Sequence, residues 1–518
     1  MRRFASLALT FGLAATLLFW LAGPGGFETI KLLWLAIILL LTVGSVSLQQ
    51  KASGAIVLYL IYLTIRAATS AGQSTAWLGT LVNPLGVVGW IIIGSLALIL
   101  INRQPDVREP IWRQRALILV SWLVLIQVYI QHATGFGIDW ITFDDPARGR
   151  ELFGSIGSPA QLGVVTALLA GLLIYHRERR WASLTNWTCL ALVIATLISG
   201  SATGIGLILI GGLAAIAPGR LVVGTTTAFV LVSALLITIK PESVKQWPSL
   251  ADRGAIWQAG WSAWSEKPLW GWGPNHFALA YDRHYPLSQL ESRALSEERA
   301  HNLPLEILVE TGLIGLLLAV YAGYSIAPLL RADQRWLPAW LWLIASLFNP
   351  VIVPVAALGL LCLNGTKRKT TSSIRSPLFL GRTFVAIILL YVSVILVQTT
   401  VAADRAAGHS AQLEFSAAAT VAERALATWP QHPQLLLIAA EARTNSALKT
   451  SSWLEAEIVA DEIARSQAQA PFFTPALTRA KISQLWLQSG HKNYQFDSAL
   501  ENWKGWSNHP RAGSIPIN

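Results

Sequence analysis

The feature that most constrains this chain is a long series of apolar segments. Each is long enough to cross, or nearly cross, a bilayer, which takes about 20 residues of α-helix. Only 13% of the 518 residues are charged, whereas soluble domains carry about 25%. The pattern predicts an all-α, polytopic transmembrane helical bundle of about 12 to 13 spans. The segments lie near residues 4–22, 30–48, 53–70, 77–101, 116–131, 160–175, 184–199, 203–217, 220–239, 303–328, 336–348, 350–364 and 382–400.

The basic residues predict how the chain is oriented. A net charge of +11 would suggest nucleic acid in a soluble protein, but cytoplasmic loops of membrane proteins concentrate Lys and Arg. We therefore expect no nucleic-acid partner. With a cytoplasmic N-terminus, the predicted inside loops hold Arg103, Arg108, Arg113, Arg115, Arg177, Arg179, Arg180, Arg331, Arg335, Lys367, Arg368, Lys369 and Arg375. This orientation places the large loop at 240–302 and the tail outside.

Two parts of the chain differ in character. Residues 1–400 predict a polytopic membrane domain that contains the 240–302 loop. Residues 401–518 are Ala-rich, with apolar residues at helical spacing, and predict a small helical domain. It is either tetratricopeptide-like or an ordinary bundle, and it offers a surface for protein partners. The first apolar segment is also compatible with a signal peptide, because Met1-Arg2-Arg3 precedes it.

Arg253 and His301 stand at the two ends of the polar stretch between apolar segments. A guanidinium carries a permanent charge and a planar fork of donors that suits phosphate, although a solvated loop arginine is the simpler interpretation. A histidine can accept a proton near neutral pH. If the fold brings the loop ends together, these two residues form one site.

Tryptophans mark the same loop. Trp257, Trp261 and Trp264 share one face if their segment is helical, and Trp272 follows in a Gly-rich turn. Tryptophan favours the membrane interface, which explains the pattern without a ligand. The functional hypothesis is that these rings line a groove and stack on sugar rings or a lipid chain.

A helix start follows His301. Asn302 is a favoured cap residue, and Pro304 fits the first turn. The exposed N–H groups of such a helix start suit an anion. Glu306 and Glu310 share a face, and a carboxylate inside a membrane helix indicates either a functional site or a structural partner.

The sequence favours neither a metal nor a cofactor. Asp144 and Asp145 precede Pro146 and suit a loop or cap, and no Asp-x-Asp pair stands in the predicted outside loops. The two cysteines, Cys189 and Cys362, lie in apolar segments without metal-ligand spacing.

The order of several short motifs resembles the O-antigen ligase and polymerase family, over about residues 110–365. The motifs are Gly154-Ser155-Ile156-Gly157-Ser158-Pro159, Arg253-x-x-x-Trp257, Lys267-Pro268-Leu269-x-Gly271-x-Gly273-Pro274-x-x-Phe277, Ala300-His301-Asn302-x-x-x-Glu306 and Glu310-x-Gly312-Leu313-x-Gly315.

The resemblance implies a polytopic glycosyltransferase of the C-type superfamily in the bacterial inner membrane. Its donor is a glycan on undecaprenyl diphosphate, and its acceptor is a sugar hydroxyl of a glycan or glycolipid. No metal is used, and the loop arginine and histidine correspond to Arg253 and His301.

One position departs from the family pattern. Ala202 stands where members often carry a cation, so a second contact to the diphosphate would have to come from elsewhere, for example from Arg150 or Arg66. Ligase and polymerase remain open alternatives. A transporter or flippase of the same lipid-linked glycan and a non-catalytic scaffold are the competing classes, but we find no internal repeats of the kind common in transporters.

Overall fold

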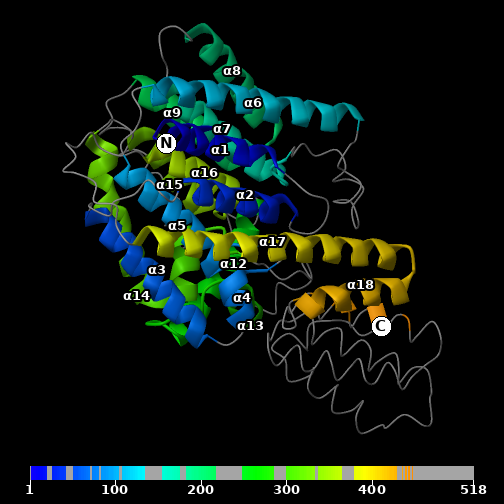
Figure 1. Ribbon diagram of the computed structural model, residues 1–518. Coiled ribbons are helices and arrows are strands. Elements are labelled where there is room, and N and C mark those ends of the chain that lie inside the picture. Colours follow the sequence, from blue (N-terminus) through cyan, green and yellow to red (C-terminus); the bar gives the residue numbers. More distant parts are fainter. Residues whose placement is uncertain are drawn as a thin grey trace, which may run out of the picture.

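The computed structural model describes most of the membrane domain and the start of the tail (Figure 1). The described residues are 2–19, 26–42, 51–70, 73–80, 83–103, 108–134, 155–175, 182–216, 248–284, 299–332, 336–363, 378–428 and the single positions 435, 438, 439, 442, 443 and 446. Within these ranges the regular elements are helices and no strand occurs. The all-α prediction is therefore confirmed for the part of the chain described.

The helices follow the predicted apolar segments closely. In chain order they are α1 (Arg2–Ala15), η1 (Thr16–Leu18), α2 (Gly26–Thr42), α3 (Lys51–Thr69), α4 (Gln73–Leu78), α5 (Val87–Asn102), α6 (Glu109–Thr134), α7 (Pro159–Tyr175), α8 (Ala182–Ile198), α9 (Ala202–Ile216), α12 (Pro248–Glu266), α13 (Phe277–His284), α14 (Leu303–Ala332), α15 (Trp336–Phe348), α16 (Val353–Cys362), α17 (Leu378–Ala411) and α18 (Phe415–Thr428).

Four of the described helices are long and apolar enough to cross a membrane: Ala52–Thr69, Glu109–Gln131, Leu303–Leu330 and Arg382–Ala411. Shorter apolar helices of 10–17 residues accompany them. The predicted segment at 220–239 lies outside the described residues.

The segment predicted at 77–101 is not one span, and this prediction was wrong in detail. It is divided between α4, which ends at Leu78, and α5, which starts at Val87. Gly79 adopts a left-handed φ of 86°, and Pro84 lacks an N–H for a helical hydrogen bond.

The core of the bundle surrounds α7. Every side chain from Leu162 to Leu173 is buried, as expected for a helix that is apolar on all sides. Helices α1, α2, α5, α6, α15 and α16 contribute to the same apolar cluster.

The polar stretch after residue 247 is itself folded. Helix α12 confirms the helical spacing of the tryptophans, and with α13 it packs on the start of α14 through a second apolar cluster around Phe277, Val309 and Ala259. Helices α12, α13 and α14 gather beside α3 and α4 (Figure 1).

The tail begins inside a helix. Helix α17 continues past residue 400 to Ala411, so the change in composition does not coincide with a helix end. Helix α18 then packs back along α17 through small residues such as Ala406 and Ala422 (Figure 1). The remainder of the tail lies outside the described residues, and its repeat-like character stays a prediction.

Candidate functional site

Helix α14 is broken at Gly312. This residue has φ 69° and ψ −173°, which interrupts the helical hydrogen bonds two turns after Glu306. Non-helical backbone at membrane depth is stable only where protein or water satisfies its polar groups. The break therefore requires partners.

A turn at residues 267–273 supplies them. The N–H groups of Trp272 and Gly273 donate to the carbonyls of Val309 (2.9 Å) and Glu310 (2.8 Å). In return, the N–H of Leu313 donates to Pro268 at 2.9 Å. A Cβ on Gly312 would lie 2.2 Å from the carbonyl oxygen of Leu269, so only glycine allows this approach.

Two side chains of helix α3 bind the same turn and the backbone next to the break. The guanidinium of Arg66 donates from Nε to the Trp270 carbonyl at 2.9 Å and from Nη2 to the Gly271 carbonyl at 3.2 Å. The hydroxyl of Tyr62 donates to the Thr311 carbonyl at 2.6 Å. Arg66, which we considered as a second contact to a diphosphate, thus supports the turn. Arg150, the other residue considered, lies outside the described residues.

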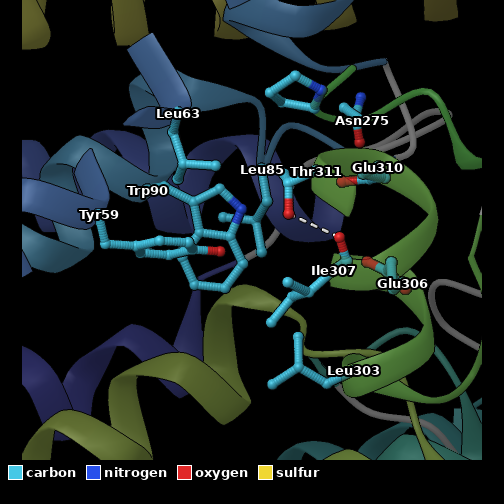
Figure 2. Close-up of a pocket in the computed structure, with 11 residues that line it drawn as sticks. Tyr59, Leu63, Leu85, Trp90, Asn275, Leu303, Glu306, Ile307, Glu310 and Thr311 are labelled. Atoms are coloured by element: carbon cyan, nitrogen blue, oxygen red, sulfur yellow. Dashed lines mark hydrogen bonds between the residues drawn. The ribbon is translucent and has the colours of Figure 1, made fainter. Parts of the chain in front are cut away.

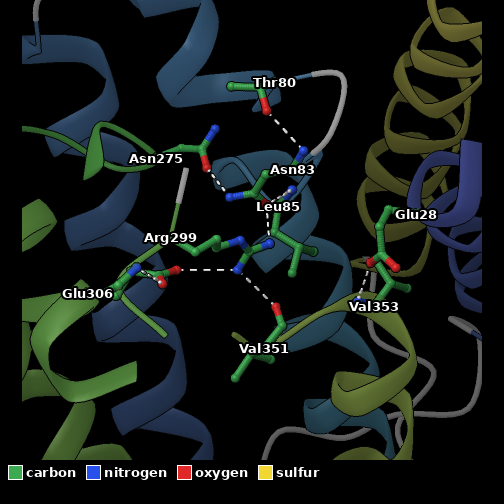
Figure 3. Close-up of polar contacts among 10 residues, drawn as sticks. Glu28, Thr80, Asn83, Leu85, Asn275, Arg299, Glu306, Val351 and Val353 are labelled. Carbon is green, nitrogen blue, oxygen red and sulfur yellow. Dashed lines mark hydrogen bonds and ion pairs between the residues drawn. The ribbon is translucent and has the colours of Figure 1, made fainter. Parts of the chain in front are cut away.

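A buried arginine organises the polar residues next to the break (Figure 3). Arg299 donates from Nη1 to the Val351 carbonyl at 3.0 Å and pairs with Glu306 at 3.3 Å. Its Nη2 donates to Oδ1 of Asn83. The second carboxylate oxygen of Glu306 accepts the backbone N–H of Ala300 at 3.2 Å. We call these residues, together with Asn275, the Arg299 network.

The hydrogen bonds of Asn83 fix the orientation of two amides. Its Oδ1 accepts from Arg299 and from the N–H of Leu85, so its Nδ2 is the side that donates to Oδ1 of Asn275, at 2.6 Å. An amide presents one acceptor and one donor side. The donor side of Asn275 is buried and has no partner in the described part of the chain.

A small pocket lies against the Arg299 network (Figure 2). Its volume is about 20 Å³, which is room for about one water molecule. The polar residues that line it include Glu306, Glu310, Asn275, Tyr59 and Trp90. In Figure 2, the Tyr59 hydroxyl and the Trp90 ring nitrogen face the side of the pocket formed by α14.

The structure also links the two ends of the loop. Trp257 stands one turn after Arg253 on α12, and its Nε1 donates to the Ala300 carbonyl at 3.0 Å. Partial burial lowers the pKa of Arg253, but an arginine stays charged in proteins. His301 follows Ala300 directly and adopts a left-handed φ of 51°.

The start of α14 matches the predicted cap. The side-chain oxygen of Asn302 accepts the N–H of Leu305 at 3.0 Å. Glu306 faces Arg299 and Ala300, so its carboxylate has structural partners. Glu310 accepts hydrogen bonds from the backbone of Asn275 and Phe277, next to the start of α13.

The tryptophans have different environments. Trp261 is 54% exposed and packs edge-on against Trp264 at 5.4 Å. Trp272 is buried, donates to the Ala263 carbonyl at 2.9 Å and is covered by the Lys267 ammonium, 3.8 Å from the ring centre. Of the tryptophans proposed to bind substrate, Trp261 is therefore the one with a broad free surface.

Sequence reasoning missed Arg299, Asn83, Asn275 and Tyr59. Asn83 and Arg299 are 216 residues apart in sequence, so no local spacing could join them. A signal existed for two of them, because Arg299 directly precedes the Ala300-His301-Asn302 motif and Asn275 follows Pro274 in the glycine-rich motif.

One comparison with known proteins matches the part of the chain that holds most of the site. Residues 152–320 match the family model described as O-Antigen ligase, which confirms the resemblance drawn from the motifs. A search of the curated proteins finds no match. The matched segment contains Arg253, His301, the Arg299 side of the network and the break in α14. Among the described residues, no group of three or more His, Cys, Asp or Glu could hold a metal ion.

Proposed function

We propose that this chain moves a glycan from undecaprenyl diphosphate to a sugar hydroxyl. The match of residues 152–320 to the family model described as O-Antigen ligase supports this proposal. The oxygen of the acceptor hydroxyl attacks the anomeric carbon, and the bond from that carbon to the diphosphate oxygen breaks. The lipid diphosphate leaves with the electron pair. Neither step calls for a metal ion in this proposal.

Arg253 and His301 take the principal roles. Arg253 stabilises the negative charge that grows on the leaving diphosphate, because preorganised donors act most strongly where charge develops. His301 accepts the proton of the attacking hydroxyl. The observation that carries this assignment is the bond from Trp257 to Ala300, which joins the helix of Arg253 to the residue before His301.

The reaction takes place at the outer face of the inner membrane in this proposal. The distribution of basic residues supports an outside position for the loop at 240–302 and for the tail. Cysteines placed at Ser288 and Ser446, in a background without Cys189 and Cys362, should react with a membrane-impermeant reagent in intact spheroplasts. Reaction only after lysis would reverse the orientation.

Product analysis in a strain that lacks the protein tests the function directly. We expect complete polymer to remain on the lipid if the protein is a ligase. Single repeat units left on the lipid would instead identify a polymerase, the second candidate of the same family. An unchanged product in both the lipid-linked and the transferred fractions would contradict both.

Paired variants test the role of Arg253. An ammonium cannot reproduce the bidentate fork of a guanidinium, so Arg253→Lys should abolish most transfer at normal abundance. Arg283→Lys is the matched control, because Arg283 is 58% exposed and contacts only Glu266, at 3.4 Å, among the ion pairs of the described residues. Equal effects of the two substitutions would remove Arg253 from the reaction.

A further inference from the structure

The pocket between α3, α5 and α14 has hydrogen-bonding capacity that the protein itself does not use. The Glu310 carboxyl group lies against the backbone of Asn275 and Phe277, and a carboxyl group keeps further acceptor capacity beyond two such contacts. On the opposite wall lie the Tyr59 hydroxyl and the Trp90 ring nitrogen, and the Nδ2 donor of Asn275 in the same lining is buried without a partner within the described ranges. Acceptor and donor groups therefore face each other across one small space.

The charges of the pocket narrow the chemistry of its occupant. A volume of about 20 Å³ is too small for a phosphate, so the lipid diphosphate does not fit here. The indole N–H of Trp90 and the amide N–H groups of Asn275 only donate, so this side of the pocket does not suit a cation. A hydroxyl group both donates and accepts, and this is the combination that the lining residues complement.

Size leads to the same class of ligand. A volume of about 20 Å³ holds about one water-sized group, so a whole sugar ring does not enter. The aromatic walls of Tyr59 and Trp90 suit the apolar side of the carbon that carries the hydroxyl.

We propose that this pocket is an acceptor subsite, which binds one hydroxyl group of the acceptor saccharide between Glu310 and the Tyr59–Trp90 wall. The hydroxyl donates to Glu310 and accepts from Tyr59 or Trp90, and no bond is made or broken there. The inference rests on the proposed transferase function and adds a recognition role. Glu310 is thus a binding residue, and the proton acceptor of the reaction remains His301.

Three substitutions test the subsite in reconstituted membranes. The donor is the lipid-linked glycan extracted from a strain lacking the protein, at saturation, and the acceptor is the glycan and glycolipid fraction of the same strain, titrated. Tyr59→Phe and Trp90→Phe each remove one hydrogen-bond donor and keep an aromatic ring. Each should raise the KM for the acceptor fraction about tenfold if the acceptor hydroxyl accepts a hydrogen bond from that donor. Glu310→Gln replaces one carboxyl oxygen by an NH2 donor and should raise the acceptor KM about tenfold if that oxygen accepts the hydroxyl. The KM for the donor should stay within about twofold, since that change lies below the contribution of one typical hydrogen bond.

Tyr62→Phe is the matched control. It removes a hydroxyl from the same helix, α3, but that hydroxyl supports the Thr311 carbonyl and does not line the pocket. We expect lower thermal stability with an unchanged acceptor KM. A role of Tyr59 in packing alone would give the same result for Tyr59→Phe as for Tyr62→Phe.

A water molecule would satisfy the same lining groups as the acceptor hydroxyl, and a second measurement distinguishes these two occupants of the pocket. Free glycan released by hydrolysis is measured without acceptor. Variants that change this release and leave the acceptor KM unchanged would show a water site and overturn the subsite. An unchanged acceptor KM in all three variants would overturn it as well. Absence of transfer by the unsubstituted protein would instead contradict the proposed function.

Discussion

Within the part of the chain that the structure describes, arginines are buried at two places, and the two places differ in how the surrounding polar groups are used. In the first, Glu109 receives Arg103 and Arg113 on one carboxylate oxygen and the Ser6 hydroxyl on the other. Arg113 also donates to the Leu361 carbonyl at 3.0 Å. We call these residues the Glu109 cluster, and it connects α1, α6 and α16.

The Arg299 network, in contrast, borders the pocket that Glu306 and Glu310 line. Its carboxylate, Glu306, lies one turn from Glu310, whose pocket carries both donors and acceptors with unused capacity among the described residues. In the Glu109 cluster, the Nε of Arg103 is also buried without a hydrogen-bond partner in the described ranges. The comparison teaches that a buried charge does not by itself mark a functional site. Donors and acceptors that face each other across a space are the more informative sign.

The largest expected effect is the loss of transfer when His301 is substituted. Its φ of 51° is tolerated best by Gly, Asn and Asp, so His301→Asn preserves the backbone and removes the imidazole. We expect transfer per folded molecule to fall about 100- to 10,000-fold, measured with saturating donor and acceptor. His301→Gln should behave similarly. Normal transfer by His301→Asn would leave Arg253 as the one assigned catalytic residue.

Removal of one charged side chain should destabilise the folded protein to a similar extent in the Glu109 cluster and in the Arg299 network. Glu109→Ala and Arg299→Ala each leave buried partners unpaired, and such changes cost about 3–5 kcal/mol. Folded protein in the membrane, measured by thermal unfolding and abundance, should fall sharply for both.

Replacing all the charged residues of one set by apolar residues should then distinguish the Glu109 cluster from the Arg299 network. Well-packed apolar residues often replace a buried ion pair without loss of stability. The triple change Arg103→Met, Glu109→Leu and Arg113→Met should restore both abundance and transfer. The double change Arg299→Met and Glu306→Leu should restore abundance only. Recovery of transfer by the double change would break the comparison.

Gly312→Ala should destabilise the break in α14. The new Cβ would lie 2.2 Å from the Leu269 carbonyl oxygen, so the turn has to move, and an alanine at this positive φ adds strain of about 1–3 kcal/mol. The melting temperature should fall accordingly. Gly323→Ala is the control on the same helix, because nothing lies within 4 Å of the position that its new methyl group would take and alanine favours a helix over glycine by about 1 kcal/mol.

The smallest expected effect is that of metal removal. The sequence predicts a metal-independent reaction, so transfer should be unchanged in excess EDTA, measured with the same donor and acceptor fractions. A complete loss that magnesium or manganese restores would point to Glu310, Asp144 or Asp145 as ligands, and would contradict the hydroxyl subsite.

The sequence predicted the membrane class and most helices, because long apolar segments have few alternatives to a helix in a bilayer. It also predicted the Asn302 cap and the helical face of Trp257, since both depend on residues within one or two turns. The division of the 77–101 segment was missed, although Gly79 and Pro84 lie within it.

The Arg299 network and the purpose of the two glycine motifs could not be predicted. Gly271 and Gly312 are 41 positions apart in sequence. A side chain at either position is excluded only because the turn at 267–273 packs directly against the break in α14. The contacts of Arg66 were not predicted either. Three of its nitrogens donate to the chain itself, at Trp270, Thr69 and Gly271, which no sequence pattern indicated.

The break in α14 has a consequence for how the protein is made. Its backbone partners are Tyr62 and the turn at 267–273, and Arg66 in turn binds two carbonyls of that turn. All of these residues precede Gly312 in the chain. Synthesis proceeds from the N-terminus at about 5–20 residues per second, so these partners leave the ribosome before the broken helix does. Helix α14 can thus enter the bilayer beside a receptor that is already in place, and its open carbonyls need not face lipid while the chain is being completed.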